Sequence, residues 1–177
     1  MNAHMVARAG VAVALLAVSA WVSVPFGPVP FTLQTLALAV LPAACDRVTA
    51  VLAVATYVLL GAVGLPVFAG FSGGMGALAG PTGGFLWGFI LGMLVATALM
   101  CLLPKRMSVF ARALMADAVL LFVSYVCGTA QLMAVASMSL PAALAIAVLP
   151  FIIPDVVKLV LGARIGCAVA RAVRVRR

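Results

Sequence analysis

The sequence has almost no acidic residues and little charge of either sign. Of its 177 residues, three are Asp or Glu, one is His, and only 8% are charged. A soluble domain carries about 25% charged residues, so this chain lacks the material for a water-facing surface. The shortage of acids and histidines also leaves little for an enzyme active site. These absences favour a transporter or a membrane scaffold over a catalyst.

The sequence also lacks the residue patterns that would indicate cysteine chemistry or nucleic-acid binding. The four cysteines are widely spaced and include no Cys-x-x-Cys pair, so neither a metal site nor a redox cofactor is expected. The net charge is +8, but the basic residues form no stripe with interleaved aromatics, so we expect no nucleic-acid partner. The Arg residues near the C-terminus are interpreted as a topology anchor, with binding of anionic lipid headgroups as an alternative.

The chain instead consists largely of apolar stretches. Hydrophobic residues make up 67% of it, and the mean hydropathy is +1.36. A bilayer core of about 30 Å needs about 20 helical residues per crossing. Proline, glycine and charge divide the chain into six such segments: 6–24, 31–45, 47–64, 82–103, 112–133 and 154–173. The sequence predicts an all-α integral membrane protein, a single domain over residues 1–177 with six transmembrane helices, the second of them short.

Basic residues occur in alternate connections between these segments. Arg8, Arg47 and the Lys105-Arg106 pair mark one side, whereas the other three connections, 25–30, 65–81 and 134–149, carry no charge. Cytoplasmic ends of membrane helices collect Lys and Arg, so both termini are predicted to be cytoplasmic. The first segment could instead be a cleavable signal peptide. We favour its retention, because its removal would leave five spans and break the charge pattern.

The uncharged connections are expected to cover a ligand cavity. Irregular backbone at membrane depth is tolerated where it is buried in protein or lines a cavity. The connection 25–30 is rich in proline, and seven glycines lie between residues 70 and 84. These glycines are not a phosphate loop, because no lysine follows them. Gly83 and Gly84 are expected to allow close helix packing, and the other glycines favour a loop that folds back over the bundle.

Asp155 and Lys158 are the ionisable residues that stand out within a predicted span. Such residues are costly in a membrane and are functional candidates. Pro154 suits the first position of a helix, which would place Asp155 near the positive end of the helix dipole. The i, i+3 spacing puts both charges on one face, directed into the bundle. A plain intrahelical ion pair is the alternative, but it barely offsets its desolvation cost, so a site for a small polar ligand is favoured.

Four blocks of the sequence, in order, resemble the BioY family, the biotin-binding S components of energy-coupling-factor (ECF) transporters. The blocks are PVPFTLQTL (28–36), GAVGLPVFAG (61–70), GPTGGF (80–85) and LPFIIPDVVK (149–158). Ile153-Pro154 departs from the Pro-Gly that many members have before the Asp. The first 24 residues match only as a generic apolar helix.

The resemblance implies a multi-pass protein of the bacterial cytoplasmic membrane that captures biotin with high affinity from outside. It also implies a transmembrane coupling protein (the T component) and cytoplasmic ABC-type ATPases as partners, and no enzymatic activity. An S component for another small vitamin-like ligand, or a scaffold without a ligand, are the alternatives. The sequence leaves the oligomeric state open, and a homo-oligomer is compatible with it.

The family's binding residues carry over to Asp155 and Lys158, and the covering loops carry over by segment. An Asp and a Lys can together satisfy the ureido group of biotin, or Lys158 can meet the valerate carboxylate. Aromatic side chains would wall the thiophane ring and the valeryl chain. The predicted ligand-binding residues are Asp155, Lys158, Phe31, Thr32, Gln34, Phe68, Phe71, Gly73, Gly74, Thr82 and Phe85.

Two further charges and one helix face have weaker interpretations. Asp117 and Arg164 are read as packing or topology residues, with contact to a cytoplasmic partner as the alternative. In the first segment, Ala3 with Ala7 and Gly10 with Ala14 lie four residues apart. This spacing lets another helix approach closely, but an alanine-rich chain produces it easily by chance.

Overall fold

The chain forms a bundle of helices with one short hairpin near its beginning. The computed structural model describes residues 3–25 and 27–175. The helices are α1 (Ala3–Trp21), α2 (Gln34–Ala44), α3 (Arg47–Ala62), the 3-10 turn η1 (Ala69–Phe71), α4 (Met75–Ala79), α5 (Gly83–Leu102), α6 (Val109–Ala136), α7 (Leu140–Ala147) and α8 (Leu149–Val175). The strands β1 (Ser23–Val24) and β2 (Phe31–Thr32) pair antiparallel.

Each of the six predicted segments contains one helix, with shifted ends. Helices α1, α5 and α6 are long and apolar enough to cross a membrane, and α7 and α8 qualify as a pair that bends by 43°. Helices α2 and α3 are apolar but shorter. The 11 residues of α2 rise about 16 Å, so the prediction of a short second segment is confirmed.

The chain is more regular than predicted in two places, directly after α1 and between α6 and α8. The first helix ends at Trp21 rather than residue 24, because the chain turns into β1 and pairs with β2. The connection expected at 134–149 holds the last turn of α6 and all of α7. Pro141 lies in the first turn of α7, where its missing N–H costs no hydrogen bond.

The last helix begins at Leu149, five residues before the predicted start. Pro150 lies in its first turn, and Pro154 therefore lies inside the helix, where it leaves the carbonyl of Pro150 without its usual donor. Asp155 is the seventh residue of α8. The prediction that Asp155 is in the first turn, next to the positive end of the helix dipole, is wrong.

Glycines allow the close approach of α5 and α6. Gly84, Gly88 and Gly92 recur every four residues on α5 and face the backbone of α6. A Cβ on Gly84 would lie 2.3 Å from the carbonyl oxygen of Cys127. Gly83 is equally crowded, since its Cβ would lie 1.8 Å from a backbone oxygen of α4. The prediction that Gly83 and Gly84 serve close packing is confirmed.

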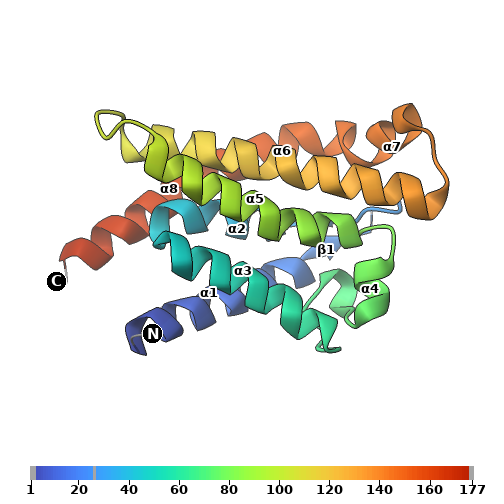
Figure 1. The fold of residues 1–177 in the computed structure, drawn as a ribbon, viewed down its shortest axis with the longest axis horizontal. Helices are drawn as coiled ribbons and strands as arrows, with labels where there is room; N and C mark the ends of the chain where they lie inside the picture. Colours follow the sequence, from blue (N-terminus) through green and yellow to red (C-terminus); the bar gives the residue numbers. More distant parts are fainter. Residues whose placement is uncertain (1–2, 26, 176–177) are drawn as a thin grey trace.

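The connections separate by charge along the bundle. Figure 1 shows both chain ends on the same side as the connection between α5 and α6, which contains Lys105 and Arg106. Helices α4 and α7 lie at the opposite end, and these belong to the two uncharged connections 65–81 and 134–149. The bundle therefore has one basic end and one end without charged connections.

Candidate ligand-binding site

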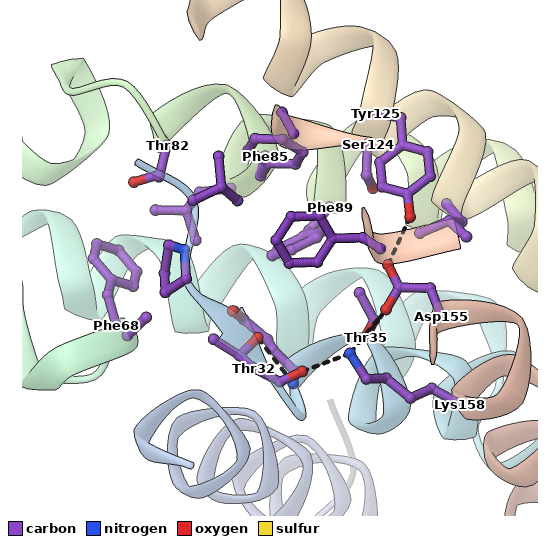
Figure 2. A pocket seen from close by; sticks show the side chains of 18 of the residues that line it. Thr32, Thr35, Phe68, Thr82, Phe85, Phe89, Ser124, Tyr125, Asp155 and Lys158 are labelled. Carbon is purple, nitrogen blue, oxygen red and sulfur yellow. Dashed lines mark hydrogen bonds and ion pairs between the residues drawn. The ribbon is translucent and has the colours of Figure 1, made fainter. Parts of the chain in front are cut away.

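A cavity lies at the uncharged end of the bundle. Its wall is formed by the hairpin connection, by α2, α5, α6 and α8, and by the glycine-rich segment 65–81, which we call the cap. Figure 2 shows that Thr35, Tyr125, Asp155 and Lys158 gather on one side. Phe68 lies on the opposite side. The cavity thus has its charged residues gathered at one side, and the rest of its wall is largely aromatic and aliphatic with a few neutral polar side chains.

Asp155 is the centre of the polar side. It is only 3% exposed. Its Oδ1 accepts hydrogen bonds from the Thr35 hydroxyl (2.9 Å) and from Lys158 Nζ (2.8 Å), and its Oδ2 accepts one from the Tyr125 hydroxyl (2.8 Å). These donors come from α2, α8 and α6. Because an unpaired buried carboxylate would be very costly, the network is what allows this charge at the cavity wall.

Lys158 connects α8 to the hairpin. Its Nζ donates to the Thr32 carbonyl oxygen (2.7 Å) as well as to Asp155. The same atom lies 3.8 Å from the centre of the Phe31 ring, a cation–π distance, and Phe31 stacks on Phe151 with 6.2 Å between centroids. The i, i+3 ion pair considered from the sequence is present, but it belongs to a wider network that reaches several elements.

Gln34 at the start of α2 links the cavity to the cap. Its Nε2 donates to the Tyr57 hydroxyl of α3 (2.9 Å), and that hydroxyl donates to the Val67 carbonyl oxygen in the cap (3.0 Å). Tyr57 is fully buried and packs edge-to-face on Phe68, with 5.5 Å between centroids. Gln34 lines the cavity and retains its carbonyl oxygen and one N–H for a ligand.

Glycines make room for the aromatic wall. The rings of Phe68 and Phe85 line the cavity. A Cβ on Gly61 would lie 1.9 Å from the Phe68 ring, and a Cβ on Gly128 would lie 2.4 Å from the Phe85 ring. Any side chain at these two positions would push the rings toward the cavity. The shape of the apolar side therefore depends on Gly61 and Gly128, which do not line it.

Seven of the eleven predicted ligand-binding residues line this cavity. They are Thr32, Gln34, Phe68, Thr82, Phe85, Asp155 and Lys158. The structure does not bring the other four to it. They are Phe31, Phe71, Gly73 and Gly74.

The two aromatic exceptions are held elsewhere by their stacking partners. Phe31 contacts both the Lys158 ammonium and the Phe151 ring, and it lines a separate apolar cleft with Phe151. Phe71 is 62% exposed and stacks on Trp21 of α1, with 5.2 Å between centroids. Phe71 therefore contacts α1 on the outside of the cap.

The two glycine exceptions shape the cap itself. A Cβ on Gly73 would lie 2.3 Å from the Leu65 carbonyl oxygen. Gly74 has a φ of +87°, which favours glycine, and its N–H donates to the Gly61 carbonyl oxygen (2.6 Å). These glycines are needed for the path of the chain over the cavity.

Sequence reasoning did not select Thr35, Tyr125, Ser124, Phe89 or Phe151, which also line the cavity. Tyr125 is one of two tyrosines in the chain, and a phenol within an apolar span was the available signal. Thr35 follows Gln34 inside a block that resembles the family. Phe151 likewise lies in the resembling block 149–158, whereas Ser124 and Phe89 have no distinguishing mark in so apolar a sequence.

Asp117 and Arg164 lie outside the cavity. Asp117 is fully buried, and among the described residues neither of its carboxylate oxygens has a hydrogen-bond partner. The Arg164 guanidinium lies 5.5 Å from the centre of the Phe110 ring. In this conformation Asp117 is not accessible to a cytoplasmic partner. Within residues 3–25 and 27–175, no group of three or more His, Cys, Asp or Glu could hold a metal ion.

The chain is similar to a set of named transporters. The model of the BioY family matches residues 1–175. The biotin transporter BioY of Thermotoga maritima is 43% identical over 159 residues, which cover 90% of this chain and 91% of the relative. The probable biotin transporter BioY of Pyrococcus horikoshii is 36% identical over 158 residues, or 89% and 91% of the two chains.

The fold is also found in a solved structure. A crystal structure of the S-component for biotin from an ECF-type ABC transporter matches with a TM-score of 0.85 and 20% sequence identity. The match covers 98% of this chain and 95% of that chain. The two proteins therefore share the same arrangement of helices.

Proposed function

The chain belongs to the BioY family, and we propose that it is the biotin-binding S component of an ECF transporter. It captures biotin at the outer face of the bacterial cytoplasmic membrane for uptake. The observation that carries the proposal is the Asp155 network, in which donors from three helices hold a buried carboxylate at the wall of an aromatic cavity. The names of the relatives support biotin as the ligand.

The cavity suits the chemistry of biotin. Asp155 Oδ2 accepts one hydrogen bond within the protein and has a further lone pair for a ureido N–H. Gln34 offers both an acceptor and a donor to the same group. Phe68, Phe85 and Phe89 provide an apolar wall for the thiophane ring and the valeryl chain. In the opposite orientation of biotin, Lys158 would face the valerate carboxylate.

The same proposal includes six crossings with both termini in the cytoplasm. The separation of basic and uncharged connections to opposite ends of the bundle supports this orientation, since cytoplasmic ends collect Lys and Arg. Most residues of the short helix α2 are buried among its neighbours. Its length is therefore matched to protein contacts rather than to the lipid.

Energy coupling would come from other chains, namely a transmembrane coupling protein and cytoplasmic ATPases. The small residues of α1 support a helix partner, because Ala3, Ala7, Gly10 and Ala14 are all exposed. A Cβ placed on Gly10 would meet nothing within 4 Å, so another helix has room to approach there. A homo-oligomer could use the same face, and co-purification distinguishes the two.

Equilibrium binding of labelled biotin to the purified protein in detergent tests the proposal. We expect saturable binding, displacement by unlabelled biotin but not by thiamine or riboflavin, and recovery of unchanged ligand. Absence of saturable binding would support the scaffold alternative. Displacement by one of the other vitamins at lower concentration than biotin would support an S component for that ligand.

A further inference from the structure

The hydrogen-bonded chain from Gln34 through Tyr57 to Val67 joins the ligand cavity to the cap. We propose that Tyr57 is a positioning residue that couples occupancy of the cavity to closure of the cap, and so sets how slowly the bound ligand leaves. This inference rests on the proposed function, because it takes biotin as the ligand. Tyr57 does not itself line the cavity.

Among the described residues, side chains from three helices donate hydrogen bonds to backbone oxygens of the cap. Trp21 of α1 donates its indole N–H to the Pro66 carbonyl oxygen (2.8 Å). Gln131 of α6 donates to the carbonyl oxygens of Leu78 (2.7 Å) and Gly80 (2.8 Å). Neither Trp21 nor Gln131 lines the cavity. The Tyr57 contact differs from both, because it continues to a side chain that does.

The direction of the hydrogen bonds explains how a ligand bound in the cavity affects the cap. A ligand bound to the Gln34 carbonyl oxygen fixes the orientation of that amide and keeps its N–H on the Tyr57 hydroxyl. The hydroxyl has a single hydrogen, which then stays on Val67. Because Tyr57 is fully buried while the cap is in place, no water competes with the Val67 oxygen for this hydrogen as long as the cap stays closed. Linked hydrogen bonds also strengthen one another.

The ring of Tyr57 has a separate role that a conservative change preserves. It packs edge-to-face on Phe68, which is 3% exposed and lines the cavity. Tyr57→Phe keeps this contact and removes only the hydroxyl. The change therefore tests the hydrogen-bonded chain without altering the aromatic wall.

The experiment measures biotin dissociation and hydrogen exchange on the full-length protein. Loss of one hydrogen bond changes an equilibrium constant by a few-fold. Tyr57→Phe should therefore release labelled biotin about three to ten times faster than wild type. In wild type, biotin should slow amide exchange over residues 65–80. In Tyr57→Phe this biotin-induced protection should be largely lost, while protection near Asp155 in α8 remains.

Trp21→Phe is the matched control, because it removes another cap donor and keeps the stack on Phe71. In Trp21→Phe the backbone amides of the cap should exchange faster than in wild type, both with and without biotin. The slowing of exchange that biotin causes should nevertheless persist. An equal loss of that protection in Trp21→Phe would overturn the coupling. A wild-type dissociation rate in Tyr57→Phe would also overturn it while leaving the proposed function intact, whereas a wild-type protein that binds no biotin contradicts the function itself.

A second variant covers the case in which Tyr57→Phe does not fold. Gln34→Met breaks the chain at the cavity end and leaves the Tyr57–Val67 contact in place. Affinity should fall because Gln34 faces the ligand. At saturating biotin, the added protection of residues 65–80 should still be lost, and its persistence would overturn the inference.

Discussion

At the scale of single residues, Asp155 and Lys158 are shared between the protein and the proposed ligand. The carboxylate is held by Thr35, Tyr125 and Lys158, and the ammonium also reaches the Thr32 carbonyl oxygen. Each charge therefore has neutral partners that remain when the other charge is removed. A variant in which both Asp155 and Lys158 are replaced is therefore expected to fold. Its ligand affinity can then be compared directly with those of the single variants.

We expect Asp155→Asn and Lys158→Met each to weaken biotin binding by roughly 10- to 150-fold. This range is the effect of losing one charge-assisted hydrogen bond of about 1.5–3 kcal/mol. The double variant should bind no better than either single variant. Isothermal titration gives the affinities, and thermal melts in detergent check the folding. Recovery of near wild-type affinity in the double variant would mean that the two charges serve only each other.

The sequence identifies the charged members of this site more readily than the neutral ones. An acid and a lysine inside an apolar segment are conspicuous, because burial of either is costly. Thr35 is 120 residues away from Asp155 and Tyr125 is 30 residues away, and hydroxyl groups are tolerated in many membrane helices. Their convergence on one carboxylate depends on how α2 and α6 pack, which no local pattern records.

At the scale of helices, the α5–α6 contact gives a stability prediction. Gly84→Ala would place a Cβ 2.3 Å from a backbone oxygen of α6, so the helices must separate. Such overpacking costs about 1–3 kcal/mol. Gly10→Ala is the matched control on α1, where a Cβ meets nothing within 4 Å and should add about 0.5–1 kcal/mol of helix stability. Thermal melts should therefore shift in opposite directions, and equal shifts would contradict the packing.

Helix positions follow from the sequence better than helix ends do. All six predicted segments contain a helix, because lipid-length apolar runs have few alternatives. The start of α8 differs from the predicted one because two prolines, Pro150 and Pro154, can each stand in a first turn. Both prolines fit the first turn of a helix, so the local sequence does not distinguish the two starts. The regular structure of 134–149 was missed for a similar reason, since α7 spans only 8 residues.

At the scale of the whole molecule, the separation of charge predicts which end faces outward. Single cysteines at Ser72 or Ser139 should react with an impermeant thiol reagent in sealed cells, and one at Ser108 should not. All three positions are exposed in the structure, so access to the reagent depends on the side of the membrane. The background needs replacements at Cys45, Cys101, Cys127 and Cys167. Labelling of position 108 from outside would reverse the orientation.

The exposed face of α1 predicts where a coupling protein binds. Ala7→Leu or Gly10→Trp should weaken co-purification with the coupling subunit, because a bulky side chain blocks close helix approach. Biotin binding should be retained, since neither residue lines the cavity. Leu91→Trp on the exposed face of α5 is the control and should leave association intact. Loss of binding together with association would show that this face supports the fold instead.

The network around Asp155 has a consequence for the entropy of capture. Hydrogen bonds from three helices restrict this carboxylate to one rotamer before any ligand arrives. Ordering a mobile side chain on association costs about 0.5–1.5 kcal/mol, which is up to roughly a tenfold change in Kd. A preorganised Asp155 avoids that cost on binding, because its side chain is already ordered in the folded protein. A scarce nutrient at low concentration is the case in which such preorganisation matters most.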